Sequence, residues 1–172
     1  MSALIARPDG LGYDPEVACR HLAETDPIMG ALIARVGQFS MRPEPAHSLF
    51  QVLVRSIVYQ QLTGRAASTI LGRVTRLFAP KRFPTPRDLL EVPPERLRAA
   101  GLSAAKTAAL KDLAARTLDR TVPSLSRVRL LHDEEIVQRL TVVRGIGRWT
   151  VEMLLIFKLG RPDVLPLGDL GV

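Results

Sequence analysis

The sequence of 172 residues has few of the features that mark a secreted or membrane protein. It contains one cysteine, Cys19, which excludes an internal disulfide and indicates a reducing environment inside the cell. One cysteine also excludes an iron–sulfur cluster held by four cysteines. No apolar run is long enough to span a bilayer, and Met1 to Gly12 has neither the charged start nor the apolar centre of a signal peptide. We therefore expect a cytoplasmic protein with no membrane partner.

The chain is basic, with 24 lysine and arginine residues against 17 aspartates and glutamates, a net charge of +7. This charge favours a polyanionic partner, with nucleic acid preferred to a membrane surface, and it fits poorly with a helical domain that binds only proteins. Arginine suits bidentate contacts with phosphate, although a GC-rich genome would enrich arginine equally well. Because 47% of the residues are apolar, we expect one domain over residues 1–172.

Sustained alternation of polar and apolar residues is also missing, so the sequence predicts an all-α fold. Asp14-Pro15 and Asp26-Pro27 are typical helix starts, and Gly37 ends the second helix. Further helices are expected from Leu49 to about Leu62, from Ala66 to Phe78, from Ser103 to about Arg120, and from Asp133 onward. The proline-rich segment from Pro80 to Pro94 is predicted to be a connector containing a short turn.

The triplet Gly145-Ile146-Gly147 joins two predicted helices, which gives a helix-hairpin-helix motif over residues 134–159. The glycines allow unusual backbone angles and close approach of another backbone, while Ile146 points inward as a peg. The N–H groups from Gly147 onward then point outward at a helix start, where an anion such as a DNA phosphate is favoured. A plain turn is the alternative, against which Arg144 and Arg148 stand at both flanks.

Residues Val143–Thr150, taken with Asp163–Asp169, resemble the core signature of the helix-hairpin-helix DNA glycosylases. They are most similar to the 3-methyladenine DNA glycosylase II family, which removes alkylated bases. The similarity extends upstream through residues 59–62 and 101–106, and covers roughly residues 27–172. It implies a two-lobed all-α fold and a monomer that acts on double-stranded DNA containing damaged bases. No cofactor is expected to be required.

The resemblance gives Asp169 the catalytic role. A carboxylate near C1′ stabilises an oxocarbenium-like transition state and can orient or deprotonate the attacking water. From the local sequence alone, an ordinary helix cap after Gly168 is the favoured role of Asp169, and the resemblance reverses this preference. Asp163 is a weaker rival in a turn.

Trp149 is the candidate for gripping the base, because an indole face attracts a cationic alkylated purine. A core tryptophan is the alternative. Bifunctional relatives carry a lysine at this position that forms a Schiff base, so tryptophan implies a monofunctional enzyme that uses water. Met153, one helical turn later, is also placed in the base pocket; some relatives have an aromatic residue there, which leaves the range of lesions open.

Leu62 corresponds to the wedge that relatives insert beside the extruded nucleotide, and a leucine in the core is its alternative. Gln60 and Gln61 are expected to bond to the orphaned base or the DNA backbone. We also assign DNA binding to Arg144, Gly145, Ile146, Gly147 and Arg148 in the hairpin. The resemblance further implies a structural monovalent cation held by hairpin carbonyls, for which Val142, Arg144 and Gly147 are the candidates.

The sequence stops at Val172, where relatives continue into a helix that anchors the catalytic acid. We therefore expect that the C-terminal part of the fold is missing, because the sequence is a piece of a longer protein or because the protein is degenerate. The rival hypothesis to an enzyme is a non-catalytic helix-hairpin-helix DNA-binding protein, in which Asp169 caps a helix and Trp149 lies in the core.

Overall fold

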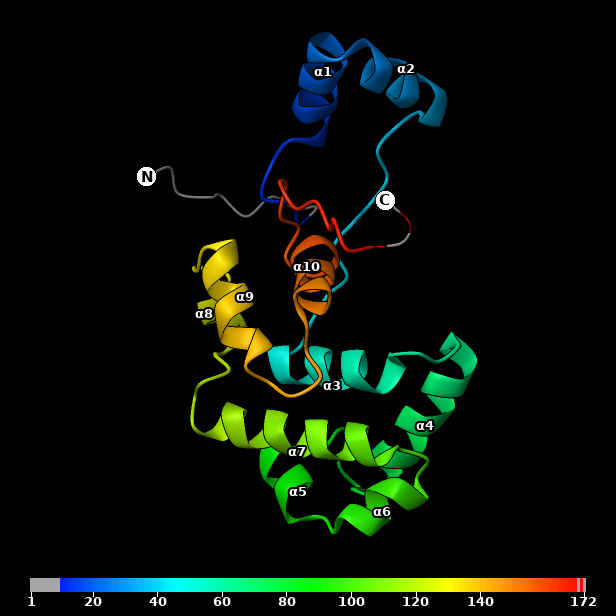
Figure 1. The fold of residues 1–172 in the computed structure, drawn as a ribbon, viewed down its shortest axis with the longest axis vertical. Coiled ribbons are helices and arrows are strands. Elements are labelled where there is room, and N and C mark those ends of the chain that lie inside the picture. Colours follow the sequence, from blue (N-terminus) through cyan, green and yellow to red (C-terminus); the bar gives the residue numbers. More distant parts are fainter. Residues whose placement is uncertain (1–9, 170, 172) are drawn as a thin grey trace. The chain divides into compact units, whose positions relative to one another are not determined.

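The structure is a computed structural model that describes residues 10–169 and 171. These residues form ten helices and no strand, so the prediction of an all-α fold is confirmed (Figure 1). The helices are α1 (Pro15–Thr25), α2 (Pro27–Val36), α3 (Leu49–Tyr59), α4 (Gly64–Arg76), α5 (Pro86–Glu91), α6 (Pro94–Ala99), α7 (Ala104–Leu118), α8 (Leu125–Val128), α9 (Asp133–Thr141) and α10 (Arg148–Phe157). Of the segment 1–12 discussed above, residues 1–9 lie outside the described residues. Within the described part of the chain, every helix is too short or too polar to cross a bilayer.

The chain divides into two compact units, which match the two predicted lobes. Unit 1 comprises residues 1–45 and 152–172, and unit 2 comprises residues 46–151. The division falls within α10, whose first turn belongs to unit 2. Whether the two units act as the single domain expected from the sequence stays a prediction.

In unit 1, α1 and α2 pack against each other as a pair of helices joined at one residue (Figure 1). Asp14 and Asp26 cap them as predicted, because each carboxylate accepts two backbone N–H groups of the first turn. Gly160, at φ +62°, is required where two segments meet. A Cβ there would lie 2.8 Å from the carbonyl oxygen of Gly10.

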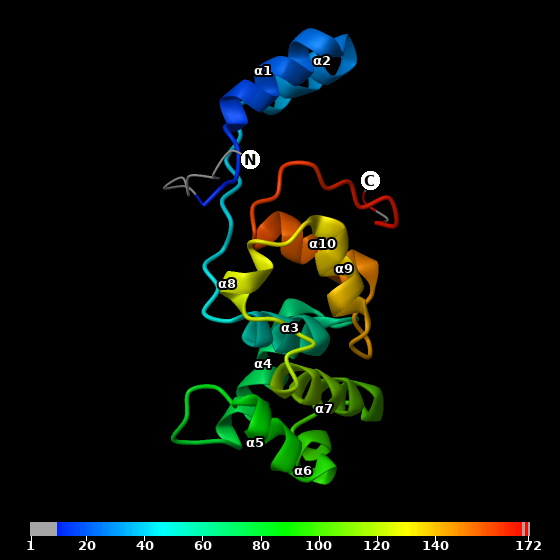
Figure 2. The ribbon, with the colours of Figure 1, turned by 90° about the vertical axis from the view of Figure 1, so that its left-hand side faces the viewer.

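In unit 2, α7 packs against α3, α5 and α6, and α3 also packs against α4 (Figures 1 and 2). The apolar faces of α3 and α7 supply the centre of the core, where Leu53, Val54, Ile57, Leu110 and Leu113 are fully buried. Ser48, Thr63 and Ser103 cap α3, α4 and α7 through their hydroxyl oxygens. These caps fix where the three helices begin, and therefore where the loops between them emerge.

The predicted connector from Pro80 to Pro94 is wrong in one respect, because this segment holds α5 and leads directly into α6. Thr85 forms a capping box with Asp88, in which each side chain bonds to the backbone of the other residue. Lys81 donates to the same carboxylate at 2.8 Å, and these bonds lower the pKa of Asp88 to about 2. Prolines at the first position of both helices therefore start helices here, as proline is suited to do.

Candidate functional site

The hairpin turn has the geometry predicted for it. Gly145 has φ +78°, a left-handed conformation that favours glycine, and the N–H of Ile146 donates to the carbonyl of Val143 at 3.0 Å. Ile146 is 3% exposed, which confirms it as the inward peg between α9 and α10. Its side chain and its N–H are therefore both occupied within the protein. Any contact of Ile146 with DNA is limited to its remaining backbone atoms.

Different physical reasons account for the glycines at positions 145 and 147 of the hairpin. A Cβ on Gly145 would lie 3.4 Å from that of Ala109, and the positive φ already disfavours any other residue. Gly147 lacks a positive φ, and a Cβ there would meet no described atom within 4 Å. The chain itself therefore does not require glycine at position 147. An external group that approaches the backbone closely would explain it.

Gly147 also stands at the start of α10, where its carbonyl accepts the N–H of Val151 at 3.3 Å. The first N–H groups of a helix have no partner within the helix, and they lie at the positive end of its dipole. Open space beside such a helix start suits a phosphate oxygen. This geometry supports the predicted anion site, although contact with DNA stays a prediction.

Gln60 connects the turn after α3 to the hairpin. Its amide Nε2 donates to the carbonyl oxygen of Gly145 at 2.8 Å, across 85 residues of sequence. This bond ties together two candidate DNA-binding segments, and the predicted contact of Gln60 with the orphaned base or the DNA backbone stays a prediction. Gln61 is the other glutamine of the pair, and for it the DNA role stays a prediction.

Lys106, on the first turn of α7, secures the same turn from the other side. Its Nζ donates to the carbonyl oxygens of Val58 at 2.8 Å and of Gln60 at 2.6 Å, at the end of α3, where carbonyls lack a donor within the helix. Partial burial lowers the pKa of Lys106 from its ordinary value. Lys106 therefore caps the end of α3.

Asp112 holds the hairpin from α7, and the sequence analysis did not identify it. Its Oδ2 accepts the backbone N–H of Arg144 at 2.8 Å, and its carboxylate also pairs with Arg116 at 2.9 Å. Asp112 and Arg116 are four residues apart on a helix, which is the one signal in the sequence for their pairing. The bond to Arg144 spans 32 residues, and no spacing rule predicts it.

The predicted wedge lies in a tight turn between α3 and α4. Gln61 has φ +56°, unusual for a residue other than glycine, and the N–H of Leu62 donates to the carbonyl of Tyr59 at 3.3 Å. Leu62 is 40% exposed, which excludes the alternative that it is a core leucine. An exposed apolar side chain on a fixed turn has the character expected of a wedge, and its insertion into DNA stays a prediction.

The base-pocket candidates are both on α10. Trp149 is 47% exposed, so the alternative of a core tryptophan is excluded. Its spacing of four residues from Met153 places both on the same side of the helix. Met153 is half-buried, and Thr150 between them is buried. Their contact with a base stays a prediction.

The two arginines that flank the hairpin differ in their surroundings. Arg148 forms an ion pair with Glu134 at 2.8 Å, at the start of α9, with both side chains more than half exposed. Such a surface pair is weak, so a phosphate can compete for the guanidinium. Arg144 is exposed, and its backbone N–H is the group held by Asp112.

Asp169, in unit 1, lies in a turn near the end of the described chain. Its N–H donates to the carbonyl of Pro166 at 2.9 Å, and its Oδ1 accepts the N–H of Gly171 at 2.8 Å. The side chain is half-buried. A carboxylate that bonds to the backbone two residues later is typical of turns and caps, so the local geometry is compatible with either role.

The hairpin carbonyls fit a cation unequally. Gly147 uses its carbonyl in the first hydrogen bond of α10, at the positive end of the helix dipole, which is a poor place for a cation. Val142 caps the end of α9, where carbonyl oxygens are exposed and the dipole is negative. Arg144 lies between the two. A cation held by the carbonyls of Val142, Arg144 and Gly147 stays a prediction.

Comparison with known proteins gives consistent matches. Residues 54–172 match the model of the HhH-GPD superfamily base excision DNA repair proteins. DNA-3-methyladenine glycosylase 1 of Schizosaccharomyces pombe is 38% identical over 153 residues, which are 88% of this chain and 67% of that protein.

Two solved structures share the fold. The Schizosaccharomyces pombe 3-methyladenine DNA glycosylase in complex with abasic DNA has a TM-score of 0.75 and 38% identity, over 89% of this chain and 75% of that one. A DNA-3-methyladenine glycosidase from Bacillus halodurans has a TM-score of 0.80 and 34% identity, over 92% and 70% of the two chains.

Proposed function

This chain belongs to the HhH-GPD superfamily of base excision DNA repair proteins, and on that premise we propose that it is a monofunctional DNA glycosylase that hydrolyses the N-glycosidic bond of alkylated bases such as 3-methyladenine. The names of its relatives support the substrate class, since the protein from Schizosaccharomyces pombe is a 3-methyladenine DNA glycosylase bound to abasic DNA. The partner is double-stranded DNA with a damaged base, bound by one copy of the chain. We also propose that the protein acts in the cytoplasm, in association with DNA.

The observation that carries this proposal is the hairpin with the wedge turn tied to it. Gly147 leaves open space at the start of α10, where a phosphate is favoured, and Gln60 fixes the turn bearing Leu62 to Gly145 of the same hairpin. Enzymes that act on a base in a duplex extrude the nucleotide and must stabilise the gap that it leaves. A phosphate grip and an apolar wedge held at a constant separation serve both tasks.

The chemistry is assigned to Asp169. As the bond between C1′ and the base nitrogen breaks, its electrons leave with the base, and positive charge develops on the sugar. The Asp169 carboxylate stabilises that charge, and a water oxygen then bonds to C1′ and gives up a proton to the carboxylate or to solvent. An alkylated base that is already cationic departs neutral. It therefore needs no proton from a general acid.

Trp149 and Met153 form the proposed base-binding side of α10. The indole face attracts a cationic base more than a neutral one, which would favour alkylated purines over normal ones. Tryptophan has no amine with which to form a Schiff base, so water is the nucleophile and no covalent intermediate arises. No cofactor takes part in this scheme. A structural monovalent cation would be held by the carbonyls of Val142, Arg144 and Gly147 and would add positive charge near the DNA phosphate.

The proposal is tested by measuring release of free base from duplexes that contain one alkylated, deaminated or oxidised base. We expect release of 3-methyladenine above the spontaneous rate, with little from the oxidised duplex. Borohydride should trap no protein–DNA adduct, because the reaction uses water. DNA binding without release of any base would instead establish the non-catalytic DNA-binding protein.

A further inference from the structure

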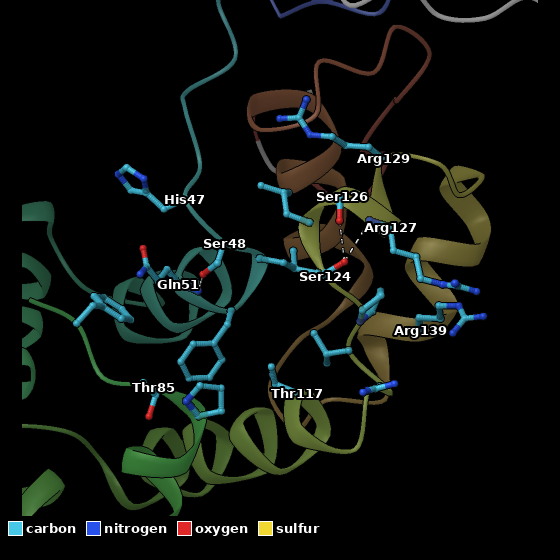
Figure 3. A pocket seen from close by; sticks show the side chains of 18 of the residues that line it. His47, Ser48, Gln51, Thr85, Thr117, Ser124, Ser126, Arg127, Arg129 and Arg139 are labelled. Carbon is cyan, nitrogen blue, oxygen red and sulfur yellow. Dashed lines mark hydrogen bonds between the residues drawn. The ribbon is translucent and has the colours of Figure 1, made fainter. Parts of the chain in front are cut away.

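Unit 2 contains a groove of about 1170 Å³ that the proposed glycosylase reaction does not use. It lies among the start of α3, the start of α5, the end of α7, and the segment of α8 and α9 (Figure 3). All residues that line it belong to unit 2. The charge and the hydrophobicity of its lining residues restrict the ligands that it can bind.

The lining of the groove is strongly basic. Arg120, Arg127, Arg129 and Arg139 line the groove, and no aspartate or glutamate is among the lining residues that the structure describes. Figure 3 shows Arg127 and Arg139 reaching the same side of the groove from α8 and α9. Arg139 is held by Glu135, one turn earlier on α9, at 3.0 Å. Grouped positive charge on a protein wall raises the local concentration of an anionic ligand.

The opposite wall is neutral and the base is apolar. His47, Ser48, Gln51 and Thr85 line the groove on the side away from Arg127 and Arg139 (Figure 3). Phe83, Pro86 and Leu125 are half-buried and leave apolar surface in the groove, and Phe50 and Val122, at 7% and 2% exposure, close its base. A ligand that fills this groove therefore presents acidic groups to one side and apolar groups to the base.

The groove is separate from the hairpin and the wedge turn. Leu49, at the start of α3, lines the groove, whereas Gln60, at the end of α3, bonds to the hairpin. Eleven residues of helix correspond to about 16 Å. On α7, Lys106 and Asp112 hold the DNA-binding segments, and Thr117 lines the groove. A ligand in the groove would therefore leave the proposed DNA-binding edge accessible.

We propose that this groove binds an acidic, extended segment of a partner protein. Arginine pairs with carboxylates through two parallel hydrogen bonds, and clusters of arginine recognise acidic peptide motifs. A peptide also supplies apolar side chains for the half-buried surface of Phe83, Pro86 and Leu125. A DNA duplex presents its phosphates on a convex surface and has no such side chain, so it can reach the arginines but cannot fill the groove. The site would recruit a partner to the protein while DNA is bound.

The test uses a library of random peptides displayed on phage, selected on the full chain. A charge-reversed variant, Arg120→Glu with Arg127→Glu, changes two exposed arginines of the groove. A matched control, Arg73→Glu with Arg76→Glu, makes the same change in net charge on the exposed end of α4, outside the groove. Thermal melts confirm that both variants fold, which is expected because all four side chains are exposed.

We expect the selected peptides to be rich in aspartate and glutamate with at least one large apolar residue. Synthetic versions, followed by fluorescence anisotropy, should bind the groove variant about tenfold or more weakly and the control normally, as loss of charged hydrogen bonds implies. Selection of peptides without acidic residues, or no selection at all, would overturn the proposal. Equal losses in both variants would overturn it too, because net charge alone would explain binding. Selective loss of affinity for undamaged duplex DNA in the groove variant would assign the groove to DNA instead.

Discussion

The hairpin of unit 2 and the Asp169 turn of unit 1 are built in different ways. Asp112 and Gln60 hold the hairpin through bonds that span 32 and 85 residues, and Lys106 secures the adjoining turn from α7. The Asp169 turn is closed by local bonds to Pro166 and Gly171, three and two residues away. The proposed binding segments are thus tied to the core of their unit by long-range bonds, and the turn of the proposed catalytic acid is closed by short-range ones.

This difference separates two requirements of base excision. Binding a phosphate and holding a wedge beside it needs two loops at a constant separation, which only long-range bonds provide. Supporting charge on a sugar needs one carboxylate in the correct place. Changes to the hairpin should therefore act on DNA affinity and on base extrusion, and changes to Asp169 should act on the rate of bond cleavage.

The largest expected effect is on the rate of bond cleavage. Asp169→Asn removes the negative charge and retains the ability to accept the N–H of Gly171, so the turn should persist. We expect the single-turnover rate of excision to fall by about a hundredfold or more, the scale for loss of a preorganised electrostatic group. Excision at a near-normal rate would remove Asp169 from the site and leave it as a turn residue.

The next effect concerns the bond between the wedge turn and the hairpin. Gln60→Ala removes the hydrogen bond to Gly145, which contributes about 1 kcal/mol, so DNA affinity should fall by about fivefold to tenfold. Gln61→Ala is the matched control, because it shortens the neighbouring glutamine and leaves that bond intact. If anisotropy titrations with an uncleavable lesion duplex show Gln61→Ala to be the weaker binder, Gln60 does not order the hairpin and Gln61 contacts the DNA.

A smaller effect is expected at the wedge itself. Leu62→Ala should slow excision several-fold from a well-paired duplex and less from a mismatched one, because unstacking costs less when the base is already loose. Single-turnover rates on the two duplexes measure the difference. Equal slowing on both would show that Leu62 contributes packing and does not act as a wedge.

The smallest effect on excision is expected at Lys106. Its contribution to the stability of the protein should depend on pH in a characteristic way. Burial places its pKa in the folded protein below the ordinary 10.5, so the charged form is disfavoured on folding. The contribution of Lys106 to stability should therefore rise as the pH increases through its folded pKa, and should be complete above 10.5. Lys106→Met should remove this rise and leave two carbonyls at the end of α3 without their donor.

Urea unfolding from pH 7 to about pH 10 measures how the free energy of unfolding changes with pH. Lys111→Met is the matched control, because Lys111 donates in the same way to carbonyls of Leu90 and Val92 near the end of α5. Both variants should lose about 1–3 kcal/mol in the free energy of unfolding. Lys106→Met alone should also weaken excision, since it alone loosens the wedge turn. Equal excision by the two variants would contradict the role of Lys106 in that turn.

Much of this architecture could be predicted from local sequence. Asp14, Asp26 and Ser103 cap the predicted helices because a cap depends on neighbours within three residues. The inward position of Ile146 follows from the glycines around it. The capping box formed by Thr85 and Asp88 depends on equally local contacts, but the prolines around it predict a loop.

The long-range contacts could not be predicted in this way. The partners of Gln60 and Lys106 are not evident from the sequence, because hydrogen-bonding capacity is visible in a sequence and the partner is not. The bonds of Gln60 and Asp112 depend on how α3 and α7 pack against the hairpin. The reason for Gly147 was also hidden, since only the structure distinguishes a glycine that needs its φ from one with open space beside it.

The most direct test of this division of roles compares Gly147→Glu with Asp169→Asn in two assays on the same lesion duplex. Gly147→Glu places a carboxylate in the space proposed for a phosphate, so the Kd for DNA should rise about tenfold or more and its salt dependence should decrease. The excision rate at saturating protein should change little. Asp169→Asn should show the opposite pattern, with a normal Kd and a rate about a hundredfold lower. If both variants change the same quantity, or if a folded Gly147→Glu protein binds DNA normally, the separation of the hairpin from the catalytic acid is wrong.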